Sequence, residues 1–153
     1  MKRISSFSHF LFRLPLGLYR LRLGWLLGSR FLQLTHTGRK SGRSYQTIIE
    51  VIGYDKTTDT YTVVSGLGPQ ADWYRNIQHT PDVVITVGRR TTSAQAEYLS
   101  KVASAQALRA YAQRYPVVSR VLSRLLLGGT LDLSDENLER LGEKMPAVVF
   151  HCR

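Results

Sequence analysis

Between residues 31 and 99, short β-rich runs alternate with turns, and only one short helical stretch interrupts them. The β-rich runs cover residues 31–36, 45–52, 61–65, 83–87 and 91–99, and the helical stretch covers 71–77. Runs of Val, Ile, Thr and Tyr bounded by Gly, Asp and Asn are typical of strands joined as hairpins. A parallel sheet would need helices between successive strands. The order therefore favours a closed or partly closed antiparallel barrel.

The remainder of the chain is mostly helical in pattern. Residues 101–115 and the apolar run 117–127 read as helices, and Ser134 is placed to cap a further one. Residues 146–150 read as a last short strand, most simply added at the barrel edge. The predicted class is thus α+β, mainly antiparallel β, with flanking helices.

The N-terminal segment 1–30 has an amphipathic helical pattern. Apolar residues recur at steps of three and four from Phe7 to Trp25, and arginines interrupt them. The arginines exclude a membrane span, and no signal-peptide cleavage site follows. Two compatible interpretations remain: a helix packed on the core, or one lying on anionic lipid through residues 7–28. We expect a single domain, with this segment preceding a barrel over residues 31–153.

Composition limits the kind of partner. The chain has 153 residues and a formal net charge of +10, which predicts attraction to anions such as acidic lipid or a phosphorylated cofactor. Basic-aromatic nucleic-acid motifs are absent, so nucleic-acid binding is not expected. The four histidines are scattered, and neither they nor the single cysteine, Cys152, stand at zinc-finger offsets, so no metal site is expected. One cysteine allows no disulfide within the chain, which fits a reducing, cytoplasmic compartment.

Residues 35–43, Thr-His-Thr-Gly-Arg-Lys-Ser-Gly-Arg, combine two glycines with three cations between two predicted strands. Cations, hydroxyls and free backbone N–H groups are what a phosphate or a polycarboxylate needs. The spacing of Gly38 and Gly42 is one residue too short for a Walker A loop. A solvated hairpin turn without function is the alternative.

Side-chain catalysis has little support in this sequence. There is no nucleophile elbow and no plausible triad, and the two strand carboxylates, Glu50 and Glu97, are expected to face solvent or pair with arginine. Anion-binding loops with aromatic residues beside them are instead typical of a protein whose bound cofactor does the chemistry.

Four motifs in order resemble the deazaflavin-dependent nitroreductase family, which includes quinone reductases. They are Thr-Gly-Arg-Lys-Ser-Gly at 37–42, Val-Ser-Gly at 64–66, Asp-Trp-Tyr-Arg-Asn-Ile at 72–77 and Pro-Asp-Val at 81–83. The resemblance covers residues 31–99, with weaker echoes at 115–116 and 146–150. It implies a six-stranded split β-barrel of the FMN-binding type that uses the deazaflavin coenzyme F420.

The resemblance also implies residue roles. The coenzyme tail would be held by the first loop, through Thr37, Arg39, Lys40, Ser41 and Gly42. Ser65 and Gly66 would lie against the deazaflavin ring, and Trp73 and Asn76 would flank the coenzyme. The catalytic candidates are Ser65 and Tyr115, the latter covering the ring from the substrate side. Packing on the barrel is the alternative role for Trp73, and a core position at a helix end is the alternative for Tyr115.

This chain departs from the family pattern at several positions. Ser44 and Tyr45 stand where relatives often carry proline and arginine, and Gly66 stands where some carry lysine. Two cationic contacts to the coenzyme tail are therefore expected to be missing. Val118 and Val121 replace substrate-side tyrosines, which predicts a more apolar substrate mouth.

The expected function is hydride transfer from reduced F420 to an electron-poor small molecule, such as a quinone, a nitro compound or an enone. One alternative keeps the barrel and binds FMN or a similar flavin. Another is a non-catalytic protein that binds a lipid or small apolar ligand, with residues 117–127 as a lid. The protein is expected to be a monomer or homodimer in the cytoplasm, with peripheral contact to the inner face of the membrane through residues 7–28.

Overall fold

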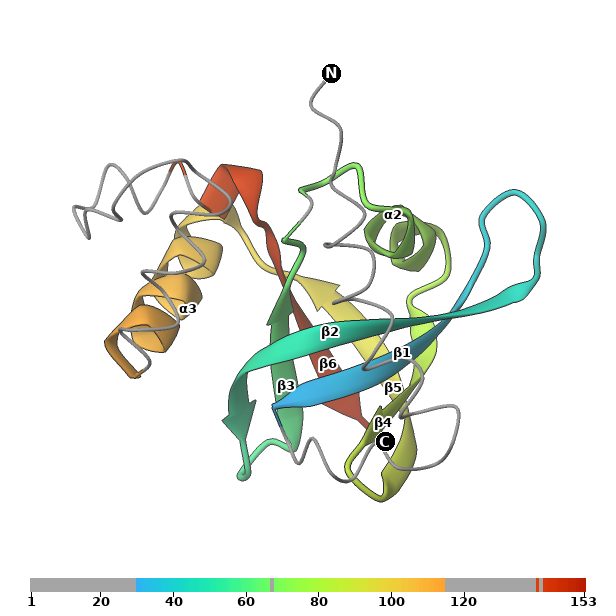
Figure 1. Ribbon diagram of the computed structural model, residues 1–153, viewed down its shortest axis with the longest axis horizontal. Helices are drawn as coiled ribbons and strands as arrows, with labels where there is room; N and C mark the ends of the chain where they lie inside the picture. The colour runs from blue at the N-terminus through green and yellow to red at the C-terminus, as the bar shows by residue number, and fades with distance from the viewer. Residues whose placement is uncertain (1–29, 67, 115–139, 141) are drawn as a thin grey trace, which may run out of the picture.

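The structure is a computed structural model that describes residues 30–66, 68–114, 140 and 142–153. Its strands close into one antiparallel barrel in the order β1-β2-β3-β6-β5-β4 (Figure 1). The strands are β1 (Phe31–Thr37), β2 (Ser44–Asp55), β3 (Thr60–Val64), β4 (Asp82–Val87), β5 (Arg90–Tyr98) and β6 (Ala147–Cys152). Helices α2 (Asp72–His79) and α3 (Lys101–Arg114) flank it. The expected six-stranded barrel with flanking helices is confirmed.

The sequence suggested that the last strand lies at the barrel edge. In the structure it instead closes the barrel. β6 pairs with β3 on one side, where Val63 is opposite Val148, and with β5 on the other, where Ala96 is opposite Phe150. The β2–β3 hairpin and the β4–β5 hairpin are already joined, because β1 pairs with β2 on one side and with β4 on the other. One strand inserted between β3 and β5 therefore pairs the backbone groups of both remaining edges, which removes the exposed edges of an open sheet.

Alternating residues of the strands fill the barrel interior. Leu32 and Leu34 on β1, Val63 on β3, Ile85 on β4 and Phe150 on β6 are all fully buried. Successive strand side chains point to opposite faces, so the period-two pattern of these apolar residues sends them inward together. The core follows directly from the pattern that identified the strands.

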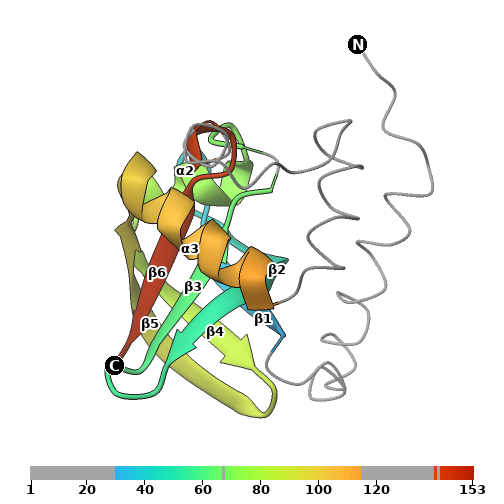
Figure 2. The same ribbon diagram turned by 90° about the vertical axis from the view of Figure 1, so that its left-hand side faces the viewer.

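Each helix covers a different part of the barrel. Helix α2 packs against β1, whereas α3 lies outside β2 and β6 (Figure 2). The Tyr111 hydroxyl of α3 donates a hydrogen bond to the Glu50 carboxylate of β2, and Ser104 Oγ accepts one from Ala147 N at 3.0 Å. No helix within the described residues has the length and apolar character needed to cross a membrane. The N-terminal segment 1–29 and the helix expected at 117–127 lie outside the described residues. Of the helix expected after Ser134, residues 140 and 142–144 are described, and they are helical.

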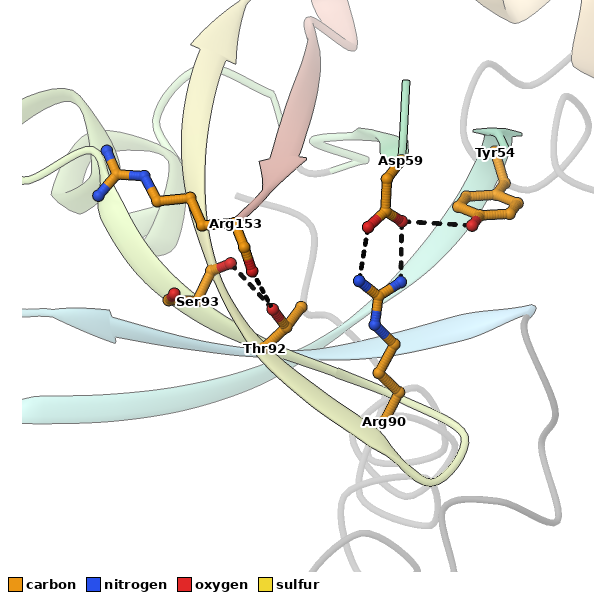
Figure 3. Close-up of polar contacts among 6 residues, drawn as sticks. All are labelled: Tyr54, Asp59, Arg90, Thr92, Ser93 and Arg153. Carbon is orange, nitrogen blue, oxygen red and sulfur yellow. Dashed lines mark hydrogen bonds and ion pairs between the residues drawn. The ribbon is translucent and has the colours of Figure 1, made fainter. Parts of the chain in front are cut away.

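An ion pair joins the β2–β3 turn to the start of β5, at the end of the barrel away from α2 (Figures 1 and 3). Arg90 donates from Nη1 and Nη2 to the two Asp59 carboxylate oxygens at 2.8 and 2.5 Å, and the Tyr54 hydroxyl donates to Asp59 Oδ1 at 3.2 Å. The hydrogen bond from Arg90 lowers the pKa of Asp59 below its usual 3.8. This pair ties the β2–β3 turn to the start of β5.

The strand carboxylates have defined partners. Glu50 lies 4.0 Å from Arg30 Nη2, as the sequence suggested. Glu97 faces solvent, as expected, with its side chain 60% exposed. It also pairs with His151, whose Nε2 is 2.5 Å from Glu97 Oε2, because β5 and β6 are neighbours in the closed barrel.

Candidate functional site

The basic loop (residues 38–43) joins β1 to β2 and extends from the barrel beside α2 (Figure 1). Gly38 N donates to Arg43 O at 2.8 Å and Gly42 N donates to Gly38 O at 2.9 Å, so the loop is a closed turn. Gly42 has a φ of +69°, in the left-handed region where a side chain would be strained. The loop is therefore an ordered, cation-rich turn.

Arg39 and Asn76, both predicted from separate motifs, meet in the structure. Asn76 Oδ1 accepts a hydrogen bond from Arg39 N at 3.1 Å and another from Arg39 Nη1 at 2.8 Å. Arg39 Nη2 donates to Asp72 Oδ1 at 3.2 Å. The Arg39 side chain is only 19% exposed, so its guanidinium is largely used to attach the basic loop to α2.

His36 completes this contact and was missed from the sequence. Its Nδ1 lies 3.0 Å from Asn76 Nδ2, and its ring is stacked on Tyr45 with centroids 6.1 Å apart. Burial lowers the pKa of His36 below its usual 6.5, and the Asp72 carboxylate partly opposes this shift. The one feature of the sequence that could have identified His36 as a site residue is its place at the end of β1, beside the basic loop. Nothing local indicated that α2 would cover it.

Tyr45 lies over the loop, at a position where the family resemblance led us to expect an arginine. Its hydroxyl is 3.2 Å from Ser41 Oγ, which also accepts a hydrogen bond from Arg43 N at 3.2 Å. A Cβ atom on Gly38 would lie 2.6 Å from Tyr45 Cε2. The tyrosine thus packs against the glycine backbone, and Ser41 supports the turn from within.

Two loop cations remain available to a ligand. Lys40 and Arg43 are exposed, and within the described part of the chain their side chains have no ion-pair or hydrogen-bond partner. Thr37 is half-buried at the end of β1, opposite Ser44. An anion that approached the loop would meet Lys40 and Arg43 first.

The segment after β3 places Ser65 in the interior. Ser65 N donates to Pro146 O at 2.9 Å, and its hydroxyl donates to Gly68 O at 2.5 Å. Ser65 is fully buried, whereas Gly66 beside it is exposed. The Ser65 hydroxyl proton is therefore used to shape the turn, and Gly66 presents the accessible backbone.

Trp73 packs partly against the core and meets Tyr74 edge-on, with ring centroids 5.8 Å apart. The packing alternative proposed for Trp73 is thus seen. Tyr115 lies outside the described residues. Among the residues that the structure does describe, no three His, Cys, Asp or Glu side chains gather as metal ligands.

Solved structures show the same fold at low sequence identity. The first, described as an F420-H2 dependent reductase (FDR-A), is 17% identical, has a TM-score of 0.53, and covers 80% of this chain and 94% of its own. A second, described as a domain-swapped dimer, is also 17% identical and has a TM-score of 0.53. The match covers 90% of this chain and 99% of that structure's chain. A third is a pyridoxamine 5′-phosphate oxidase-related, FMN binding protein from Nostoc punctiforme, 14% identical, with a TM-score of 0.50 and coverage of 98% and 82%.

Sequence comparison identifies the family more specifically than these folds do. No curated protein matches the chain significantly. The family model for F420H(2)-dependent quinone reductase matches residues 19–121, more than half of the chain. This span includes the basic loop, the turn after β3 and α2. The chain therefore belongs to the F420H(2)-dependent quinone reductase family, and it is an oxidoreductase that depends on F420.

Proposed function

We propose that this protein binds reduced F420 and directs its hydride to an electron-poor acceptor, such as a quinone, a nitro compound or an enone. The observation that carries the proposal is the basic loop, fixed against α2 by Arg39 and leaving Lys40 and Arg43 exposed. The F420 tail carries a phosphate and glutamates, and cations beside free N–H groups bind such groups well. The chain's residues thus fit the coenzyme that its family uses.

Lys40 and Arg43 are the proposed contacts of the anionic tail. Arg39 and Asn76 act mainly by holding the loop, because their polar atoms already bond one another. Gly42 permits the turn, and Ser41 and Thr37 offer hydroxyls along it. The tail would therefore be held by fewer cations than the sequence motif contains.

The turn after β3 is the proposed ring contact. Gly66 offers an exposed backbone N–H, while Ser65 keeps the turn in shape through its bond to Gly68. When bound, the reduced deazaflavin supplies the hydride. A backbone N–H or hydroxyl would stabilise the charge that develops on the acceptor, and water would supply the proton. Trp73 beside the coenzyme and Tyr115 over the ring stay predictions.

The binding assay follows coenzyme fluorescence as F420 is titrated into the protein. The double variant Lys40→Gln/Arg43→Gln should weaken binding by up to about thirtyfold, because each exposed ion pair contributes up to about 1 kcal/mol. Its affinity should also depend less on salt. Lys56→Gln, an exposed cation in the β2–β3 turn, is the matched control. Unchanged affinity in the double variant would remove the loop from the site.

FMN is the second candidate coenzyme, favoured by the FMN binding protein among the structural neighbours and by Tyr45 in place of an arginine. A parallel titration with FMN decides between them, and binding of FMN alone would overturn the F420 assignment. Oxidation of reduced F420 by quinone, nitroaromatic and enone acceptors, followed by absorbance, identifies the acceptor class. Binding without turnover of any acceptor would favour the non-catalytic ligand-binding alternative.

The cellular setting forms part of the same proposal. We place the protein in the cytoplasm, with residues 7–28 on the inner face of the membrane, where apolar quinones dissolve. Liposome flotation of the full chain and of a chain lacking residues 1–28 checks this, and equal, salt-insensitive recovery of both in the soluble fraction would exclude it. Light scattering separates the monomer from the homodimer. One structural neighbour is a domain-swapped dimer.

A further inference from the structure

The hydrogen bonds around Asn76 leave its side-chain amide only one satisfactory orientation. Arg39 approaches with two donors, its backbone N–H and its Nη1, at 3.1 and 2.8 Å from the same Asn76 oxygen. Arginine has no acceptor, so the Asn76 oxygen must face Arg39 and the Asn76 amide nitrogen must face the other way. That nitrogen meets His36 Nδ1 at 3.0 Å.

This orientation dictates the state of the His36 ring. The Asn76 amide nitrogen is a donor, so His36 Nδ1 has to accept and cannot carry a proton. The ring is then neutral, with its proton on Nε2. Turning the Asn76 amide over does not rescue a protonated ring, because the amide donors would then face the two donors of Arg39. Only neutral His36 satisfies both contacts of Asn76.

We propose that His36 is a positioning residue for the basic loop: its ring holds the Asn76 amide in the one orientation that accepts both hydrogen bonds from Arg39. The anchored Arg39 backbone N–H directly precedes Lys40, so this contact also fixes where Lys40 is presented. For its consequence in coenzyme affinity, the inference rests on the proposed function. Its first test does not need the coenzyme.

Within the described residues, few other groups can disturb this arrangement by titrating. There, the charged groups that face His36 are Asp72 on α2 and, beyond Asn76, the Arg39 guanidinium of the loop. Tyr45 of β2 stacks on the ring. The β4 residues paired with β1 are Thr86, Ile85 and Val84, which do not titrate. Burial lowers the pKa of His36, so the neutral ring prevails near pH 7 and is lost only as the pH falls below about 6.5.

The first experiment is an NMR titration of the ligand-free protein from about pH 8 to about pH 5. We expect the imidazole nitrogen shifts to show a proton on Nε2 and none on Nδ1 near neutral pH. The Arg39 amide signal should move with the same pKa as His36. His36→Asn keeps an acceptor near the Nδ1 position but does not titrate, so in this variant the low-pH movement of the Arg39 amide should vanish.

The second experiment measures F420 affinity over the same pH range. Wild-type affinity should fall about tenfold more than that of His36→Asn, which corresponds to the loss of about one hydrogen bond. His36→Phe keeps the ring bulk without the acceptor, so it should bind weakly at every pH. Circular dichroism confirms that each variant is folded, and if His36→Asn is not, the wild-type NMR titration decides.

The outcomes separate the two ideas. An Arg39 amide that ignores the His36 titration, or that moves equally in His36→Asn, would overturn the positioning role. So would equal pH profiles of F420 affinity in the two proteins. A wild-type protein that binds no F420 would overturn the proposed function, while the NMR titration would still decide the role of His36.

Discussion

Tyr111 links α3 to the barrel through a polar contact with β2. Its hydroxyl donates to the Glu50 carboxylate, and the side chain is 6% exposed. Burial, reinforced by the hydrogen bond to Glu50, raises the pKa of Tyr111 above its usual value. The neutral phenol is therefore the donor throughout the physiological range.

Removing this hydroxyl should loosen α3. Tyr111→Phe is expected to lower the free energy of unfolding by about 1–2 kcal/mol, because Glu50 loses a donor in a half-buried position. Urea denaturation followed by circular dichroism measures the change. Tyr54→Phe, which removes the exposed bond to Asp59, is the matched control and should cost less. Equal costs would show that the contact to Glu50 contributes no more than a surface hydrogen bond.

At the same scale, the sequence predicted that residues of separate motifs lie together, but it did not predict what each of them contacts. Arg39 and Asn76 were both assigned to the coenzyme, and the structure brings them together, but as partners of one another. His36 was missed because its role depends on Asn76, 40 residues later in the chain. Motif spacing reports a shared site, whereas hydrogen-bond partners depend on tertiary packing.

Among the elements, the strands followed the sequence pattern more closely than the turns did. β2 runs to Asp55, although the sequence ended this β-rich run at residue 52. Tyr54 is opposite Tyr61, and their stacked rings lie 4.4 Å apart, so this cross-strand pair extends the hairpin. Asp59 then turns the chain with a φ of 52°. A pair across two strands is not visible in the local composition of either strand.

The basic loop makes its own prediction as an element. Gly38→Ala would place a methyl group 2.6 Å from Tyr45 Cε2 and 2.7 Å from Ser41 Oγ, so Tyr45 must move. We expect a loss of stability of about 1–2 kcal/mol, as for other overpacked sites. Urea denaturation of the single and double variants measures the coupling.

The matched background for this change is Tyr45→Ala. There the cost of Gly38→Ala should fall clearly, because the main clash has been removed. A cost that is the same in both backgrounds would mean that Tyr45 does not pack on the loop backbone. The aromatic contact at the position where relatives often carry arginine would then need another explanation.

At the scale of the whole molecule, the barrel is closed by contacts between distant parts of the chain. Tyr61 on β3 and Ala96 on β5 are both opposite Phe150 on β6. The sequence predicted this last strand but placed it at an edge, because an isolated strand pattern does not reveal two neighbours. Loops that lie far apart in sequence are held together by this closure. The site therefore depends on the last strand, although none of its candidate residues lies there.

Phe150→Ala tests whether the barrel and the candidate site unfold together. Phe150 is fully buried, so the deletion should lower the free energy of unfolding by about 3–5 kcal/mol. Val149→Ala, at the neighbouring half-buried position, is the control and should cost far less. Unfolding should be followed both by far-ultraviolet circular dichroism and, in a Trp25→Phe background, by the fluorescence of Trp73, which belongs to the predicted site and packs against the same core. Coincident transitions are expected because one core serves both, whereas an earlier fluorescence transition would mean that α2 and the site unfold independently of the barrel.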